Sequence, residues 1–136
     1  MPVLRLSRPH ERVPGKDPRF QVVDFVSGGG LELAPGVRMR PLFGDGAMLN
    51  LLDFEPNARV PEHSHPHEQL GMVVEGELVL QIDGVPHRLR PGSAYQIPGG
   101  VPHAAWTEVD PCRVLDVFQP VREDYREKAR AVIPPG

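Results

Sequence analysis

Residues 61–69 read PEHSHPHEQ and contain three of the six histidines of the chain. In an extended strand, residues two apart point to the same face, so His63 and His65 can aim their imidazoles at one point. Gln69 has the same parity and could add an oxygen ligand, although Pro66 interrupts the strand between them. A His-x-His pair also occurs on ordinary strand surfaces, so the pair alone does not decide between a metal site and a surface.

A third imidazole is available further along the chain. Residues 98–103 read PGGVPH, a rigid turn that leads into a short strand beginning at His103. Three imidazoles and one amide oxygen suit a divalent transition metal such as zinc, nickel, iron or manganese. We therefore expect one such metal ion per chain, and we expect His67 and His87 to be surface residues.

The spacing of these residues resembles the two motifs of the cupin superfamily. The first motif, G-x5-H-x-H-x3/4-E-x6-G, runs here through Asn57, His63, His65, Gln69 and Gly76. The second, G-x5-P-x-G-x2-H-x3-N, runs through Gly92, Pro98, Gly100, His103 and Thr107. Three residues depart from the family pattern: Asn57, Gln69 and Thr107.

The resemblance covers residues 50–120 well and residues 20–50 loosely. It implies a jelly-roll β-barrel in which one metal is held by His63, His65, Gln69 and His103. The same fold implies a pocket lined by further inward side chains, for which the candidates are Arg38 or Arg40, Met48, Tyr95 and Gln96. Of these, Arg40 and Gln96 are the substrate contacts that we expect.

Gln69 stands where the family usually has Glu. A neutral amide leaves the full divalent charge on the metal, which makes it a stronger Lewis acid and attracts an anionic substrate group. A centre of two histidines and one carboxylate is therefore not what this sequence offers. Some cupin oxygenases use three histidines, so oxygen chemistry stays open.

The strand expected at residues 112–118 places Asp116 among apolar neighbours. By alternation it shares a face with Cys112, Val114 and Phe118. A buried carboxylate is costly unless it is paired or used. Two roles remain open: a proton-transfer group in the pocket, or a structural carboxylate bonded to a loop or to Arg122.

Residues 116–125 read DVFQPVREDY. This string resembles the DVFSPPREDY ending of a group of cupins that linearise unsaturated uronic acids in pectin and alginate breakdown. The resemblance implies that Asp116 transfers a proton, that Phe118 forms a pocket wall, and that Arg122 holds the substrate or Asp116.

The composition favours short strands joined by turns. The chain has 136 residues, of which 14 are Gly and 17 are Pro, and Pro breaks helix interiors. Strands are predicted at 20–26, 31–33, 37–43, 47–55, 69–75, 77–83, 86–90, 93–97, 103–108 and 112–118, and one helix at 122–132. The sequence thus predicts an all-β domain at residues 20–120, preceded by an extended arm at 1–19 and followed by a short C-terminal helix and tail at 121–136.

Charge and cysteine content exclude several classes of protein. The formal net charge of −3 argues against a nucleic-acid binder, and no apolar run is long enough to span a membrane. The single cysteine, Cys112, forms no intrachain disulfide. The N-terminus lacks the apolar segment of a signal peptide, so we expect a cytoplasmic protein.

Three functional hypotheses follow. The first is a metal-dependent enzyme of isomerase or lyase type that ring-opens unsaturated uronates; the second is a metal-dependent dioxygenase of a small organic substrate. The third is a cupin that binds a small ligand without turnover. All three expect a small-molecule partner, which is anionic in the first. If Gln69 faces inward, then Leu70, Met72 and Val74 face outward, and such an apolar face predicts a homodimer.

Overall fold

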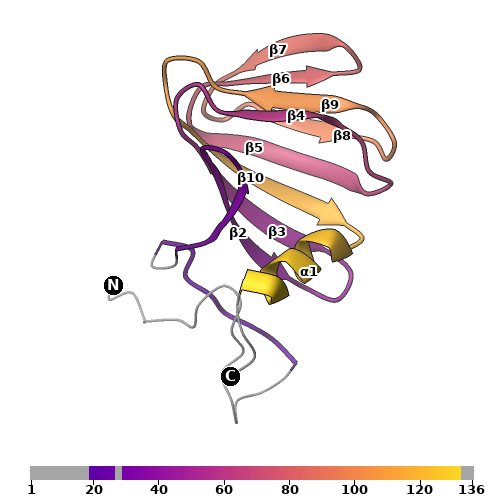
Figure 1. The fold of residues 1–136 in the computed structure, drawn as a ribbon. Helices are drawn as coiled ribbons and strands as arrows, with labels where there is room; N and C mark the ends of the chain where they lie inside the picture. Colours follow the sequence, from indigo (N-terminus) through magenta and orange to yellow (C-terminus); the bar gives the residue numbers. More distant parts are fainter. Residues whose placement is uncertain (1–18, 27–28, 133–136) are drawn as a thin grey trace.

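The computed structural model describes residues 19–26 and 29–132, and within them ten strands form two antiparallel sheets. The six-stranded sheet has the order β1-β2-β3-β10-β5-β8, and the four-stranded sheet has the order β4-β9-β6-β7. The elements are β1 (Leu31–Ala34), β2 (Val37–Phe43), β3 (Met48–Phe54), β4 (Arg59–His63), β5 (Glu68–Gly76), β6 (Leu78–Ile82), β7 (Val85–Leu89), β8 (Ala94–Ile97), β9 (His103–Trp106), β10 (Cys112–Gln119) and α1 (Glu123–Val132). Figure 1 shows the strands stacked into the barrel, with α1 beside the ends of β2 and β3. The predicted all-β jelly roll with a short C-terminal helix is confirmed.

The core lies between the sheets and follows strand alternation. Every second residue of β3 is buried, and β10 repeats the pattern from Cys112 to Phe118. Asp116 belongs to this inner set and is paired in register with Asn50 on β3 and with Gly71 on β5. The inner face of the six-stranded sheet is mainly apolar, but it includes one row of polar and small residues, formed by Asn50, Asp116 and Gly71.

Two departures from the cupin motifs have a structural explanation. Asn57 has a φ of 56°, a left-handed conformation that Asn tolerates better than most residues with a side chain, so it can replace the leading Gly. The Thr107 hydroxyl donates to the Glu55 carbonyl oxygen and accepts from the Ala58 amide at 3.0 Å. Thr107 thus ties the end of β9 to the turn before β4.

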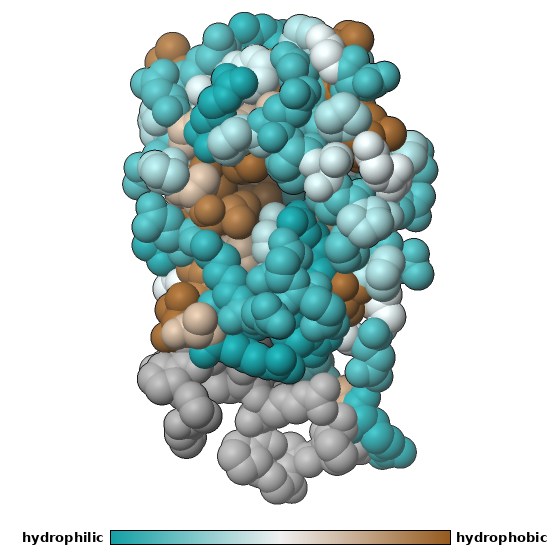
Figure 2. All heavy atoms as spheres, turned by 45° about the vertical axis from the view of Figure 1, so that its right-hand side comes forward, coloured by the Kyte–Doolittle hydropathy of each residue, from teal (hydrophilic) through white to brown (hydrophobic). Residues whose placement is uncertain are grey.

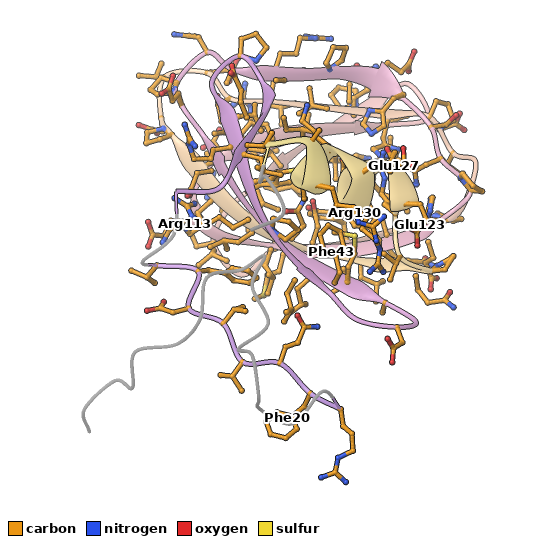
Figure 3. All side chains as sticks on the ribbon, turned by 60° about the horizontal axis from the view of Figure 1, so that its bottom comes forward. Phe20, Phe43, Arg113, Glu123, Glu127 and Arg130 are labelled. Atoms are coloured by element: carbon orange, nitrogen blue, oxygen red, sulfur yellow. The ribbon has the colours of Figure 1, made fainter. Side chains whose placement is uncertain are left out.

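The N-terminal part of the chain differs from the prediction. Residues 20–26 form no strand, and only Val23 makes an isolated bridge. Phe20 is 64% exposed, and Figure 3 shows it outside the barrel. In contrast, β4 was not predicted as a strand of its own. The predicted arm and tail fall almost entirely on residues 1–18 and 133–136, outside the described residues.

Helix α1 closes one end of the barrel with its buried residues Tyr125 and Ala129. Its charged residues Glu123, Glu127 and Arg130 are exposed, and Figure 3 shows where they lie on the helix. Within the described part of the chain, no helix combines the length and the apolar character needed to cross a membrane.

Candidate metal centre

Three histidines converge at one end of the barrel. His63 ends β4 and His103 begins β9, and the two are paired in register in the four-stranded sheet. His65 lies in the loop between β4 and β5, not in a strand, so alternation alone does not aim it. A hydrogen bond from the Gly100 amide to the His65 carbonyl oxygen, at 2.8 Å, joins the two segments that carry the histidines.

The three side chains are close enough to share one ion. One ring nitrogen from each lies within 4.8 Å of the others. The ring centroids of His63 and His103 are 4.4 Å apart, and those of His65 and His103 are 4.9 Å apart. The expected convergence of two separated stretches is therefore present.

Backbone carbonyls fix the tautomer of each ring. The Nδ1 atoms of His63, His65 and His103 lie 2.8, 3.1 and 2.9 Å from the carbonyl oxygens of Pro61, His67 and Val101. A carbonyl oxygen only accepts, so each Nδ1 carries the proton and donates it. Each Nε2 is left with a lone pair, which is the state required of a metal-binding imidazole.

Two observations test whether these residues fit a cation. The Nε2 atom of His103 is buried and makes no hydrogen bond with the described residues. The Nε2 atom of His65 faces the Oε1 atom of Gln69 at 3.1 Å, so two acceptors point at each other. A cation bound by both atoms removes the repulsion and satisfies His103 as well. The donor set of three imidazole nitrogens and one amide oxygen therefore fits a divalent transition metal.

Burial keeps His65 and His103 in the neutral form that binds a metal. Burial, reinforced by Arg122 and His103, lowers the pKa of His65 to about 4. Burial also lowers the pKa of His103. Both rings are neutral at pH 7, so no proton competes strongly with a metal for their nitrogens.

Asp116 is buried beside this site, on the inner face of β10. The Tyr95 hydroxyl donates to its Oδ1 atom at 2.5 Å, and the side chain of Gln69 also hydrogen-bonds to it. Burial raises the pKa of Asp116 to about 6, while these two hydrogen bonds and the Arg122 charge oppose the rise. Gln69 thus contacts both His65 and Asp116.

Arg122 is buried, but its ion pair is made with Asp124 and not with Asp116. Its Nε and Nη2 atoms donate to the Asp124 carboxylate at 3.2 and 2.8 Å, and its Nη1 atom donates to the Tyr125 hydroxyl at 2.8 Å. Its guanidinium carbon lies 5.1 Å from the centre of the Phe118 ring. A guanidinium has five N–H groups, so among the described residues one N–H on each terminal nitrogen is left without a hydrogen-bond partner.

Two of the expected substrate contacts are not brought to the site. Arg40 alternates with the buried residues of β2 and binds Asp53 at 2.5 Å on the outer face of the sheet. Gln96 is exposed and donates to Glu68 at 2.8 Å. The assignment of these two residues to the pocket is corrected, because strand parity turns both side chains away from the barrel interior.

The remaining sequence candidates are also placed. His87 is exposed, as expected, whereas His67 is half-buried, with its ring centroid 5.6 Å from that of His65. Phe118 lies between the site and α1, with its ring centroid 5.4 Å from that of His65. Sequence reasoning missed Asn50, whose amide is fully buried on β3 with no hydrogen-bond partner among the described residues. A polar residue at a core position of an alternating strand was the signal that could have found it.

A cavity of about 40 Å³ opens between the histidines and Asp116. It is lined by His63, His103, Gln69, Tyr95, Asp116 and Arg122 together with apolar side chains. Such a volume holds a cation and a few small ligand atoms, so only the reacting end of a larger molecule would enter. Figure 2 shows one face of the molecule, where apolar side chains line a hollow with a hydrophilic rim.

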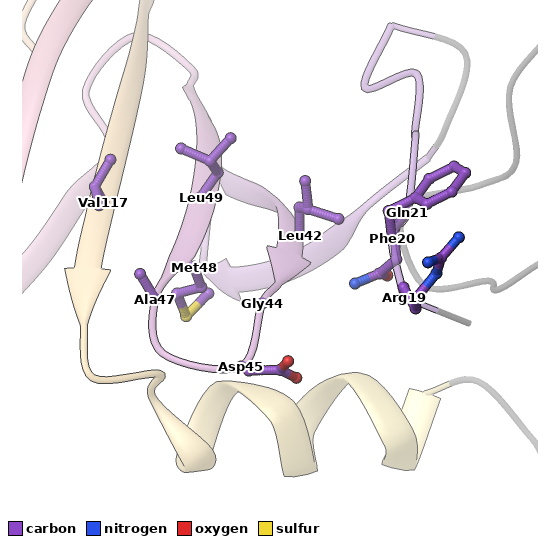
Figure 4. A pocket seen from close by; sticks show the side chains of 10 residues that line it. All are labelled: Arg19, Phe20, Gln21, Leu42, Gly44, Asp45, Ala47, Met48, Leu49 and Val117. Atoms are coloured by element: carbon purple, nitrogen blue, oxygen red, sulfur yellow. The ribbon is translucent and has the colours of Figure 1, made fainter. Parts of the chain in front are cut away.

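A larger cavity, of about 420 Å³, lies elsewhere, between residues 19–21 and the turn that joins β2 to β3 (Figure 4). Its charged side chains are Arg19 and Asp45, and the rest of its lining is mainly apolar. No histidine lines it. Of these two cavities, the smaller one is therefore the one that is lined by candidate metal ligands.

The comparisons with known proteins agree with the geometry. The structure of KdgF from Halomonas sp. superposes with a TM-score of 0.70 and 27% sequence identity, covering 75% of this chain and 94% of that one. The HTH-type transcriptional regulator PuuR of Escherichia coli is 35% identical over 69 residues, 49% of this chain and 37% of its own length. Dimethylsulfoniopropionate lyase DddW of Ruegeria pomeroyi is 36% identical over 56 residues, 41% of this chain and 37% of its own length.

The chain spans little more than a third of these two curated relatives, so their activities are not carried over with the fold. The cupin domain family itself matches residues 50–118, about half of the chain. That match runs from Asn50 on β3 to Phe118 on β10 and includes all three converging histidines. The chain belongs to the cupin family.

Proposed function

We propose that this cupin is a metal-dependent enzyme that opens the ring of unsaturated uronates. The observation that carries the proposal is the buried Asp116 carboxylate, which lines the same small cavity as His63 and His103. The resemblance of residues 116–125 to the ending of uronate-linearising cupins supports the same substrate class. A carboxylate, a cation site and a buried Arg are the groups that such a reaction needs.

The reaction is an isomerisation. A base removes the proton of the anomeric hydroxyl of the cyclic hemiacetal, the bond between the anomeric carbon and the ring oxygen breaks, and an aldehyde and an enolate result. A proton delivered to the enol carbon then gives the open-chain keto product. Atoms and electrons balance without an oxidant, so no redox partner is required.

The residues divide this work. Asp116 accepts the hydroxyl proton and returns a proton to the enol carbon. The two remaining N–H groups of Arg122 bind the uronate carboxylate, and the Phe118 ring walls the pocket. A divalent cation held by the three histidines and Gln69 would supply Lewis acidity toward a bound substrate oxygen.

Three variants and two measurements test the proposal. Metal content is measured by elemental analysis, and turnover is measured on unsaturated galacturonate. His103→Ala should lose both the metal and the turnover, whereas Asp116→Asn should keep the metal and lose turnover on the order of 10²-fold. His87→Ala removes an exposed histidine and should keep both, which makes it the matched control.

The same assay separates the alternatives. Turnover that persists without oxygen supports the isomerase, whereas oxygen consumption with loss of turnover under anaerobic conditions supports a dioxygenase. A second candidate is a ligand-binding cupin without turnover, which the similarity to the regulator PuuR favours. Tight binding of a small anion, with no turnover by the metal-loaded protein, would support that candidate and overturn the enzymatic proposal.

We also propose that the functional unit is a homodimer. Leu70, Met72 and Val74 are 46%, 42% and 40% exposed on the outer face of β5. Leu115 and Val117 on β10 are paired in register with Met72 and Leu70, so the apolar surface continues onto the next strand. A second copy of the chain, laid on this face, would cover it.

A further inference from the structure

We propose that Tyr95 is the positioning residue for Asp116, acting across a gap left in the barrel wall by Gly71. The inference rests on the proposed function, since it assigns a partner to the proton-transfer residue of that reaction. It concerns a residue that neither the cupin motifs nor the uronate-type ending includes.

The sheet register places the three residues in one row. Gly71 of β5 is the antiparallel partner of Asp116 on β10 and also of Tyr95 on β8. Tyr95 and Asp116 therefore lie on strands that are not neighbours, roughly 10 Å apart at two strand spacings. Tyrosine is long enough to cross the intervening strand.

The crossing requires that position 71 have no side chain. A Cβ atom placed on Gly71 would lie 2.3 Å from the Oδ1 atom of Asp116 and 2.3 Å from the hydroxyl oxygen of Tyr95. These are the two atoms joined by the 2.5 Å hydrogen bond. The glycine thus makes room for this one contact, and any other residue would push its partners apart.

Tyr95 is a permanent donor in this contact. Burial and the adjacent carboxylate raise its pKa well above the usual value, so the hydroxyl keeps its proton. The ring lines the cavity that also contains His63 and His103. Because Oδ1 of Asp116 is bound by the hydroxyl, the carboxylate is held in one rotamer relative to the histidines.

The test compares Tyr95→Phe, which removes only the hydroxyl, with Gly71→Ala, which inserts the Cβ atom. Gly46→Ala is the matched glycine control, because a Cβ there meets nothing within 4 Å. Turnover and metal content are measured, and crystal structures are determined, for all three variants.

We expect both pocket variants, Tyr95→Phe and Gly71→Ala, to keep their metal and to show a changed Asp116 rotamer. In Tyr95→Phe, kcat should fall on the order of tenfold to a hundredfold with little change in KM. Gly46→Ala should match the parent protein.

An unchanged Asp116 rotamer and an unchanged kcat in Tyr95→Phe would overturn the inference, even if Gly71→Ala fails to fold. A loss of metal in Tyr95→Phe would also overturn it, because the tyrosine would then support the cation site. If the parent protein turns over no uronate, the proposed function fails. The Asp116 rotamer in the crystal structures of Tyr95→Phe and Gly71→Ala still decides whether Tyr95 holds the carboxylate.

Discussion

Asn50 places a fully buried amide on the inner face of β3, in register with Asp116. Neither its oxygen nor its nitrogen has a hydrogen-bond partner among the described residues. An unsatisfied buried amide costs about 1–3 kcal/mol of folding free energy, and leucine has the same branching without polar atoms. We therefore expect Asn50→Leu to raise the free energy of unfolding by about 1 kcal/mol, measured by urea titration.

Asn50→Ala is the control for this prediction, since it removes the amide but leaves a void and should be less stable than Asn50→Leu. A clear destabilisation of Asn50→Leu would show that the amide has a partner, such as a buried water molecule, and would contradict the prediction.

The single thiol gives a prediction that depends on pH. Burial raises the pKa of Cys112 from 9.0 to about 12. Only the thiolate reacts with alkylating reagents, so the folded protein should react slowly at pH 9, where an unfolded thiol is half ionised. Raising the pH from 9 toward 12 should increase the alkylation rate of the folded chain, and urea at pH 9 should increase it at once. Mass spectrometry measures the extent of alkylation. Rapid alkylation of the folded protein at pH 9 would contradict the prediction that the Cys112 thiol is protonated there.

Single residues differ in how well the sequence predicts them. The convergence of the three histidines was foreseeable because motif spacing carries it, and Asp116 because a carboxylate stood in an apolar run. Arg40 and Gln96 were misplaced because alternation groups residues by face without telling which face is inside. The hydrogen bond between Tyr95 and Asp116 was out of reach, since it joins strands that meet only in the folded sheet.

At the level of elements, turn chemistry made most strands predictable. Residues 37–43 match β2 in full, and the helix begins one residue later than predicted. The segment 20–26 has the composition of a strand, but among the described residues its ladder pairing is limited to the isolated bridge of Val23. Strand β4 was not predictable from the sequence, because most of its residues are exposed and it lacks the alternation typical of a half-buried strand.

The stability of the barrel should depend on Gly76, at the junction of β5 and β6. Gly76 ends β5 with a φ of 79°, and a Cβ atom there would lie 1.9 Å from the Pro111 carbonyl oxygen. Gly76→Ala should lower the free energy of unfolding by about 2 kcal/mol or more, because left-handed strain alone costs of order 1–3 kcal/mol. Chemical denaturation measures the loss.

Gly84→Ala separates the two causes. Gly84 has a φ of 81° but nothing within 4 Å of an added Cβ, so that variant carries the strain without the collision. Equal losses in both variants would show that the approach of Pro111 has no effect on stability.

For the whole molecule, the outer face of the six-stranded sheet predicts the oligomeric state. The chain has a mass of 15.0 kDa, so light scattering of the parent protein should give about twice that mass. Met72→Lys places a charge in the middle of the apolar face and should yield monomers that keep the barrel fold. Val85→Lys is the control, because Val85 is also exposed but lies on β7 of the other sheet. A monomeric parent protein would remove the proposal.

The candidate metal ligands come from both sheets of the barrel. His63 and His103 belong to the four-stranded sheet, whereas Gln69 projects from the six-stranded sheet. One cation would therefore clamp the two layers together, and binding to the folded chain alone adds to its resistance to opening. Proteases digest opened chains, so in a cell the lifetime of this protein would follow the supply of a trace element.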